Sequence, residues 1–167
     1  GGFVDPVKNL DIRGLFPKQL AQIKEGYCYR RTGRATPETS DVVSGKAVKM
    51  ESKYAVIAFA AGNLYTGQFG AINGVGAELD WGVKFNGRPV ALRGYYKYAP
   101  KAIDRTKSPY ENMAGTMDKC VIQVILTKWD KPFHVNTTAG QFVDLENDPD
   151  IIATAKYTSD VTTDGYV

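Results

Sequence analysis

The sequence has few of the residues from which most catalytic and metal sites are built. It holds two cysteines, Cys28 and Cys120, and a single histidine, His134. Without a Cys/His cluster, neither a zinc site nor a Ser-His-Asp triad has enough residues to form. Two cysteines are also too few for a disulfide framework, so the cysteine content does not decide between an oxidising and a reducing compartment. The apolar run around Cys120 favours a buried thiol.

Long apolar runs and a basic stripe are also absent. No apolar stretch approaches the roughly 20 residues of a membrane-spanning helix. The net charge is only +3, and the cations of residues 88–107 are offset by carboxylates in residues 144–164. This balance argues against nucleic acid as a partner. The Gly1-Gly2 start is typical of a processed chain, and an additional N-terminal domain in the full-length protein fits that start.

Aromatic and turn-forming residues are plentiful. Ten Tyr, seven Phe and two Trp occur together with seventeen Gly and eight Pro in 167 residues. This composition favours one all-β domain, an antiparallel two-sheet β-sandwich spanning residues 1–167. Within it, residues 1–44 are expected to be irregular, with one short helix over Pro17–Glu25 and a loop over 30–41. Residues 45–167 are expected to form the β-sandwich core.

Strands are expected where apolar and polar side chains alternate. Cys120–Thr127 is apolar on both faces, which predicts a central strand. Asn86-Gly87 predicts a hairpin turn, and 99–116 a polar loop. Gly165-Tyr166-Val167 reads as the opening of a strand, so terminal strands are expected to be missing from this chain. The other expected strands are Lys46–Met50, Tyr54–Ala60, Glu78–Phe85, Arg88–Tyr98, a weaker one within Pro132–Val143 and a short one at Ile151–Ala153.

The Arg88–Tyr98 stretch carries the most distinctive pattern. Alternation places Val90, Leu92, Tyr96 and Tyr98 on one face. The other face carries an aromatic ring between two long hydrogen-bond donors, which suits a flat, polar ligand such as a sugar. We therefore predict that this second face binds carbohydrate through Arg93, Tyr95 and Lys97. The face with Tyr96 and Tyr98 is the alternative platform. In the alternative without a ligand, the tyrosines pack in the core or at an edge and the cations are solvated.

Four motifs occur in order: Gly45–Met50, Ala60–Gly67, Gly87–Tyr98 and Asp148–Ala153. Together they resemble the "putative carbohydrate metabolism domain" of cell-envelope proteins from Bacteroidetes, over roughly residues 45–167. The resemblance implies a jelly roll similar to carbohydrate-binding modules and to some glycoside hydrolases. It also implies export to the periplasm or outer-membrane surface of a Gram-negative bacterium, and an oligosaccharide or polysaccharide as partner.

Four further residues are candidates for binding sugar. Asn63 and Tyr65 lie in a polar, aromatic loop between two expected strands, where Tyr65 could equally cap the core. Gln123 and Trp129 would join the Arg93, Tyr95 and Lys97 face if the central strand pairs nearby.

Two acidic groups are the weaker candidates. Glu78 and Asp80 share one strand face about 7 Å apart, within the range of a glycosidase acid/base pair. A jelly-roll glycosidase of the laminarinase type would have a third carboxylate where Val83 stands, so solvated outer residues are the main alternative. In the acidic loop, Asp144, Glu146 and Asp148 could hold a structural Ca²⁺, although a plain hydrated turn fits as well. His134 reads as a structural or surface residue.

The sequence thus predicts a non-catalytic carbohydrate-binding domain of an exported glycan-utilisation protein. A glycoside hydrolase using Glu78 and Asp80 is the first alternative. A structural or adhesin-like sandwich module without a small ligand is the second. No cofactor is expected beyond the structural Ca²⁺.

Overall fold

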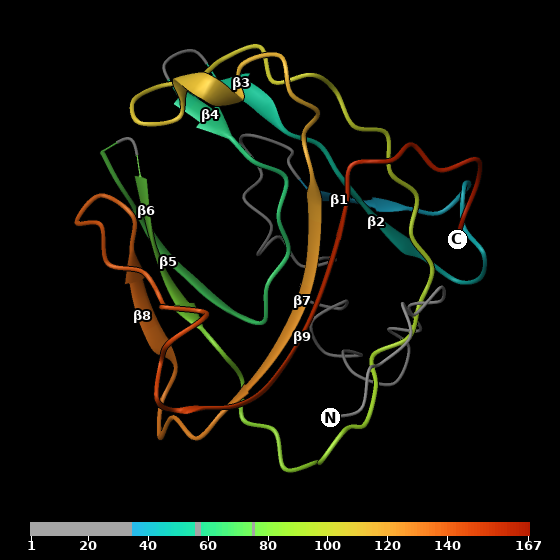
Figure 1. Ribbon diagram of the computed structural model, residues 1–167. Helices are drawn as coiled ribbons and strands as arrows, with labels where there is room; N and C mark the ends of the chain where they lie inside the picture. Colours follow the sequence, from blue (N-terminus) through green and yellow to red (C-terminus); the bar gives the residue numbers. More distant parts are fainter. Residues whose placement is uncertain (1–34, 56–57, 75) are drawn as a thin grey trace. The chain divides into compact units, whose positions relative to one another are not determined.

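The computed structural model describes residues 35–55, 58–74 and 76–167 (Figure 1). The predicted helix over Pro17–Glu25 lies outside these residues. The regular secondary structure of the described part is almost entirely β, in antiparallel sheets, as expected for an all-β sandwich. Its one helical element is the 3-10 helix Glu111–Met113, within the predicted polar loop. No helix of the described part has the length and apolar character needed to cross a membrane.

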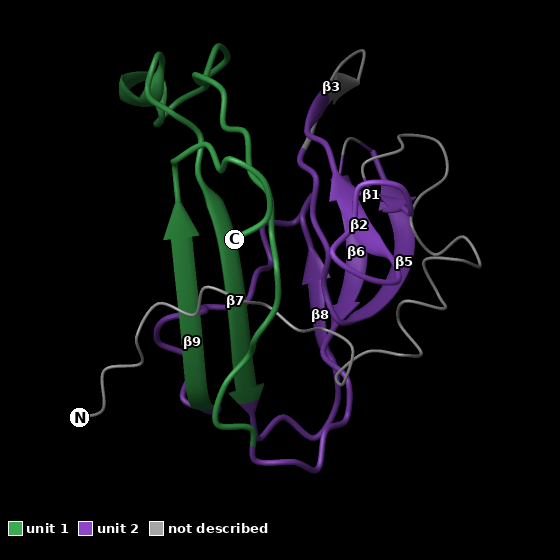
Figure 2. Ribbon diagram, turned by 90° about the vertical axis from the view of Figure 1, so that its right-hand side faces the viewer, with its two compact units in different colours: residues 1–12, 89–126, 152–167 green, residues 13–88, 127–151 purple. Residues whose placement is uncertain are grey.

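The chain divides into two compact units (Figure 2). The first unit holds residues 89–126 and 152–167. The second holds residues 127–151 together with the described residues up to 88. The expected single domain over residues 1–167 stays a prediction.

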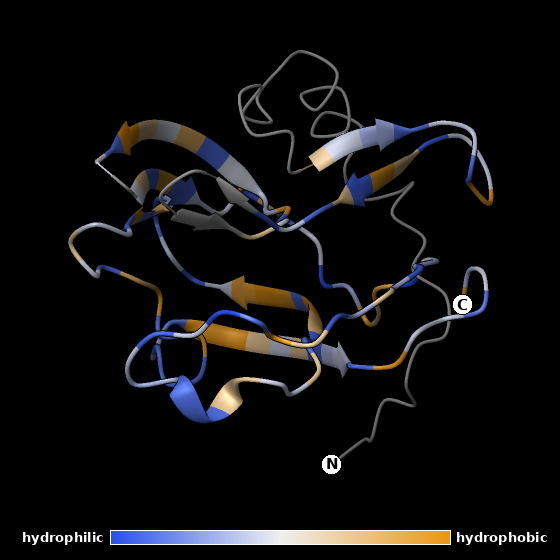
Figure 3. Cartoon of the chain, turned by 90° about the horizontal axis from the view of Figure 1, so that it is seen from above, coloured by the Kyte–Doolittle hydropathy of each residue, from blue (hydrophilic) through white to orange (hydrophobic). Residues whose placement is uncertain are grey.

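The first unit contains the two longest strands. β7 (Cys120–Thr127) pairs with β9 (Ile151–Ser159), and the two run in opposite directions in Figure 2. β7 is rich in β-branched residues and is apolar along most of its length, whereas β9 begins apolar and ends polar (Figure 3). The predicted strand at Cys120–Thr127 is therefore confirmed. The prediction that this strand is central in its sheet is wrong for the described residues, where β7 has β9 as its one neighbour.

The second unit is built around a three-stranded sheet in the order β5-β6-β8. These strands are β5 (Gly67–Asn73), β6 (Gly76–Trp81) and β8 (Phe133–Asn136). Across β6 and β8 the register pairs Leu79 with Val135 and Asp80 with His134. Val135 is only 1% exposed and is the most buried large side chain described. The sheet therefore has one face toward a small core and a polar face opposite.

β5 was not predicted. Two of its seven residues are glycines and three others are Gln, Ala and Asn, so its β-propensity is low. Pairing with β6 requires glycine at position 67, because a Cβ there would run into the carbonyl oxygen of Asp80. The register also shifts between Phe69 and Ala71, at Gly70. Here the partner strand decides the structure, and local propensity does not.

Two smaller sheets complete the second unit. β1 (Ala35–Glu38) pairs with β2 (Ala47–Met50), and β3 (Lys53–Ala55) pairs with β4 (Ala58–Ala60). The predicted strand at Lys46–Met50 is confirmed. The predicted loop over 30–41 is wrong at residues 35–38, and the single strand at Tyr54–Ala60 is instead two strands of a hairpin.

The predicted strand at Arg88–Tyr98 does not form a ladder, and the Asn86-Gly87 turn joins no hairpin. A single bridge at Gly94 is present. Pro89 and Pro100 lack an N–H, which limits ladder formation at both ends. Tyr96 instead exchanges two backbone hydrogen bonds with Val167, with N···O distances of 3.0 and 3.1 Å.

Three other strand boundaries differ from the prediction. β6 ends at Trp81, leaving Val83 and Phe85 exposed. β8 confirms the weaker strand within Pro132–Val143. β9 continues to Ser159, six residues beyond the expected end, and includes polar residues such as Lys156.

Replacing Val135 with alanine should lower the free energy of unfolding by about 2 kcal/mol, because it removes two fully buried methyl groups. Val43→Ala is the matched control in the same unit, since Val43 is 50% exposed; it should change stability by less than about 0.5 kcal/mol. Urea denaturation followed by circular dichroism measures both. Equal effects of the two substitutions would contradict the assigned core.

Candidate functional site

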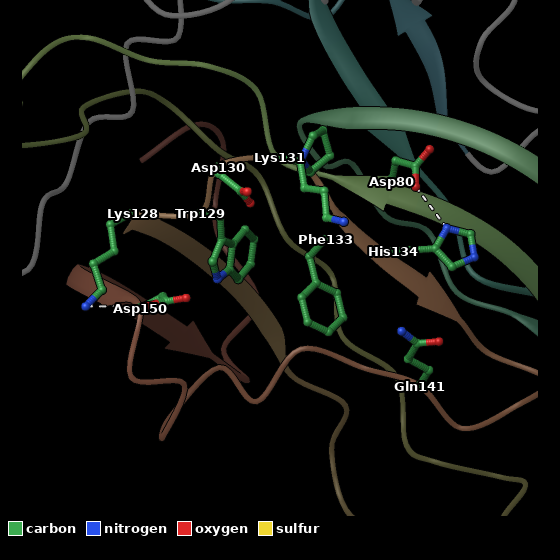
Figure 4. Close-up of a pocket in the computed structure, with 10 residues that line it drawn as sticks. Asp80, Lys128, Trp129, Asp130, Lys131, Phe133, His134, Gln141 and Asp150 are labelled. Atoms are coloured by element: carbon green, nitrogen blue, oxygen red, sulfur yellow. Dashed lines mark hydrogen bonds and ion pairs between the residues drawn. The ribbon is translucent and has the colours of Figure 1, made fainter.

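A pocket of about 690 Å³ lies in the second unit (Figure 4). We call it the Trp129 pocket. Its floor and walls come from the end of β6, the start of β8 and the loop that enters β8. The lining residues are Asp80, Lys128, Trp129, Asp130, Lys131, Pro132, Phe133, His134, Gln141 and Asp150.

Two aromatic rings form the apolar part of this pocket. The centroids of Trp129 and Phe133 lie 5.4 Å apart, with their planes tilted by 39°. Trp129 Nε1 donates a hydrogen bond to Asp148 Oδ2 at 3.2 Å. This bond satisfies the indole N–H and fixes the ring, so the Trp129 platform is held in place before any ligand arrives.

A polar pair lies on one side of the rings. His134 Nδ1 lies 2.9 Å from Asp80 Oδ1, and His134 Nε2 lies 4.0 Å from Glu78 Oε2. Because a carboxylate only accepts hydrogen bonds, we assign a proton to Nδ1. The pairing follows directly from the register, which sets Asp80 opposite His134. His134 is thus an oriented member of the pocket and not an isolated surface residue.

An ion pair lies on the opposite side of the rings. Lys128 Nζ lies 3.4 Å from Asp150 Oδ1, and the backbone N–H of Lys128 also donates a hydrogen bond to the backbone carbonyl of Asp150 at 2.9 Å. Figure 4 shows this pair and the Asp80–His134 pair on either side of the two rings, with Gln141 near Phe133 and His134. The pocket therefore combines an aromatic surface with hydrogen-bonding groups around it.

Glu78 is turned to other partners. Its Oε1 accepts hydrogen bonds from Asn73 Nδ2 at 3.1 Å and from Asn136 Nδ2 at 3.3 Å. Asp80 lines the Trp129 pocket, whereas Glu78 does not. The structure thus places the two predicted acid/base candidates on one strand but gives them different surroundings.

The comparisons with known proteins give one match. The family model described as "Putative carbohydrate metabolism domain" matches residues 20–167. The chain belongs to this family. The match begins at residue 20, whereas the resemblance inferred from the sequence motifs begins only at about residue 45. No curated protein and no solved structure matches the chain.

In this carbohydrate metabolism domain, the Arg93, Tyr95 and Lys97 surface lies in the first unit. All three side chains are exposed, whereas Leu92, Tyr96 and Tyr98 are half-buried, so the predicted alternation is present without a ladder. Val90 departs from it, being 96% exposed. Lys97 Nζ lies 5.1 Å from the centroid of the Tyr166 ring, a cation–π contact.

The other predicted sugar contacts are divided between the two units. Gln123 lies on β7, with its amide nitrogen 3.5 Å from Thr154 Oγ1. Trp129 belongs to the second unit, as do Asn63 and Tyr65. Tyr65 is half-buried with its ring 6.0 Å from that of Trp81, which matches its alternative reading as a cap on the core.

The acidic loop is held together by its own hydrogen bonds. Asp144 Oδ1 accepts the N–H groups of Asn147 at 2.9 Å and Glu146 at 3.1 Å. These bonds, the Asn147 one foremost, lower the pKa of Asp144. In the described residues, no three acidic, His or Cys side chains come together as a metal site requires. Binding of Ca²⁺ here stays a prediction.

Tyr96 and Tyr157 form a half-buried pair in the first unit. The hydroxyls of Tyr96 and Tyr157 are 2.6 Å apart, and their rings meet edge to face. Burial, together with this hydrogen bond, raises the pKa of Tyr96 to about 12. Burial also raises the pKa of Tyr98 to about 12 and that of the free Cys120 thiol.

These shifts predict an alkaline limit to stability. A raised pKa means that the folded state holds its proton more tightly than the unfolded state. Stability should therefore hold up to the ordinary tyrosine value of 10.0 and fall as the pH rises toward about 12. Tyr96→Phe should make that fall less steep, measured by urea denaturation at several pH values. Tyr157→Phe should do so only partly, because burial of Tyr96 remains; an unchanged slope in Tyr96→Phe would contradict the assignment.

Proposed function

We propose that this chain binds carbohydrate in the Trp129 pocket. The observation that carries the proposal is the placement of two aromatic rings, 5.4 Å apart, in one pocket with the oriented Asp80–His134 pair. Membership of the family supports a role in carbohydrate metabolism. The family gives no reaction and no binding residue, so the choice of site comes from the geometry.

The chemistry of a sugar suits these groups. A pyranose ring has faces of C–H groups, which pack on aromatic rings, and a rim of hydroxyls, which both donate and accept hydrogen bonds. In the pocket, Trp129 and Phe133 offer the apolar surface. Asp80 offers acceptors, Lys131 offers donors, and the Gln141 amide offers both. A neutral, polar ligand with an apolar face would satisfy all of them.

Hydrolysis by the predicted Glu78/Asp80 pair is disfavoured, because the two carboxylates have different surroundings. Glycosidases place two carboxyl groups on either side of the scissile bond. Glu78, the predicted partner of Asp80, is hydrogen-bonded to Asn73 and Asn136 and does not line the pocket. We therefore retain the non-catalytic function. Export from the cell, with a polysaccharide or oligosaccharide as partner, remains part of the proposal through the family resemblance.

The proposal predicts that Trp129→Ala weakens carbohydrate binding at least about tenfold, because an aromatic platform contributes about 1.5 kcal/mol. Screening should use oligosaccharides of glucose, mannose, galactose, xylose and N-acetylglucosamine, followed by NMR titration of any that bind. Trp129→Phe, which keeps a ring but loses the bond to Asp148, should bind with intermediate affinity. Circular dichroism checks that each variant is folded.

Tyr95→Ala is the matched control, since Tyr95 is an exposed aromatic residue outside the pocket. It should leave affinity unchanged. If Tyr95→Ala abolishes binding and Trp129→Ala does not, the Arg93, Tyr95 and Lys97 surface is the site and the Trp129 pocket is not. Failure of every carbohydrate in the screen to bind would refute the proposed function itself.

A further inference from the structure

A second, smaller hollow of about 300 Å³ lies in the same unit. We call it the Gln68 hollow. It is lined by the β5 residue Gln68, by Val83 and Lys84 after the end of β6, and by Asp80 and Pro132. Asp80 and Pro132 also line the Trp129 pocket. The two hollows are therefore neighbours with a common wall.

A row of polar residues runs from one hollow to the other. The register pairs Gln68 with Asp80 and Asp80 with His134, so the three occupy one line across β5, β6 and β8. Side chains of directly paired residues lie on the same face of a sheet. With neighbouring strands about 4.8 Å apart, the row is about 10 Å long. That length suits a disaccharide better than a single sugar ring.

Gly82 connects the hollows on their other side. It lines the Gln68 hollow, and a Cβ built on it would lie 3.8 Å from Cε3 of Trp129. Its φ of +106° is one that residues with a side chain rarely adopt. The backbone at this point therefore passes close to the aromatic platform, and Gly82 itself places no side chain there.

We propose that the two hollows form one groove with two subsites, and that the ligand is an oligosaccharide of at least two units that crosses Asp80. This inference rests on the proposed function and specifies its substrate class. The Trp129 pocket would take one sugar ring on its aromatic surface. The Gln68 hollow would take the next ring through the Gln68 amide and the Lys84 ammonium group.

The test is the dependence of affinity on chain length. NMR titrations should compare the monosaccharide, disaccharide and trisaccharide of the series that binds in the screen. Affinity should rise at least tenfold from the monosaccharide to the disaccharide. Gln68→Ala and Lys84→Ala should remove most of that gain and leave the monosaccharide affinity within about twofold. Both side chains are exposed, so the variants should fold.

Two further variants make the result specific. Gln141→Ala alters the Trp129 pocket alone and should weaken all chain lengths equally. Lys49→Ala removes an exposed lysine from β2, outside both hollows, and should change nothing. A monosaccharide that binds as tightly as the disaccharide would overturn the two-subsite groove while leaving the proposed function standing. Equal weakening of all lengths by Gln68→Ala and Lys84→Ala would also overturn it.

Discussion

The antiparallel register between β6 and β8 is the constraint on which the rest of the candidate site depends. A strand has a side-chain period of two, so a slip of β8 by one residue would move His134 to the core face and Val135 to the polar face. The burial of Val135 makes that shift costly. The small core of this unit therefore fixes which polar residues meet, and the Asp80–His134 contact follows from apolar packing on the opposite face.

The second constraint is the support of Trp129. This residue lies in the loop between β7 and β8, where no ladder holds it. The turn before β9 does so instead: Asp148 accepts the indole N–H, and Asp150 bonds to both the backbone and the ammonium group of Lys128. The acidic loop, which by its composition suggested calcium, thus orients the aromatic platform in this structure. Loops held in this way by a neighbouring turn often carry ligand contacts.

Local patterns in the sequence predicted some of this and missed the rest for a physical reason. Alternation and apolar content identified the strands at 120–127 and 133–136, because those signals are contained in the strand itself. β5 is polar and rich in glycine, so its strand structure depends on β6 as a partner. For Arg88–Tyr98, alternation correctly predicted which side chains are exposed, but prolines and distant bonds to Val167 and Thr163 replaced the expected ladder.

The site shows the same division. The sequence indicates Asp80 and Trp129 as site candidates, Asp80 together with Glu78 and Trp129 together with Tyr95, but it does not bring Asp80 and Trp129 into one pocket as the structure does. The sequence indicates only a structural or surface role for His134, because its hydrogen-bond partner Asp80 is 54 residues away on a paired strand. The available signal is the matching alternation of Glu78-Leu79-Asp80 and His134-Val135-Asn136, which pair across β6 and β8.

The polar pairs at the pocket contribute more to the orientation of its side chains than to the stability of the fold. Exposed pairs such as Asp80–His134 and Lys128–Asp150 typically contribute between 0 and about 1 kcal/mol to folding. Each nevertheless fixes a flexible polar group beside the aromatic rings. His134 contacts one oxygen of Asp80, and a carboxylate has two oxygens with about four acceptor positions. A ligand hydroxyl can therefore meet an acceptor that is already oriented, which reduces the entropy lost on binding. In the lining, Lys128 and Lys131 also offset most of the negative charge of the three aspartates, which matches a neutral ligand better than a strongly charged one.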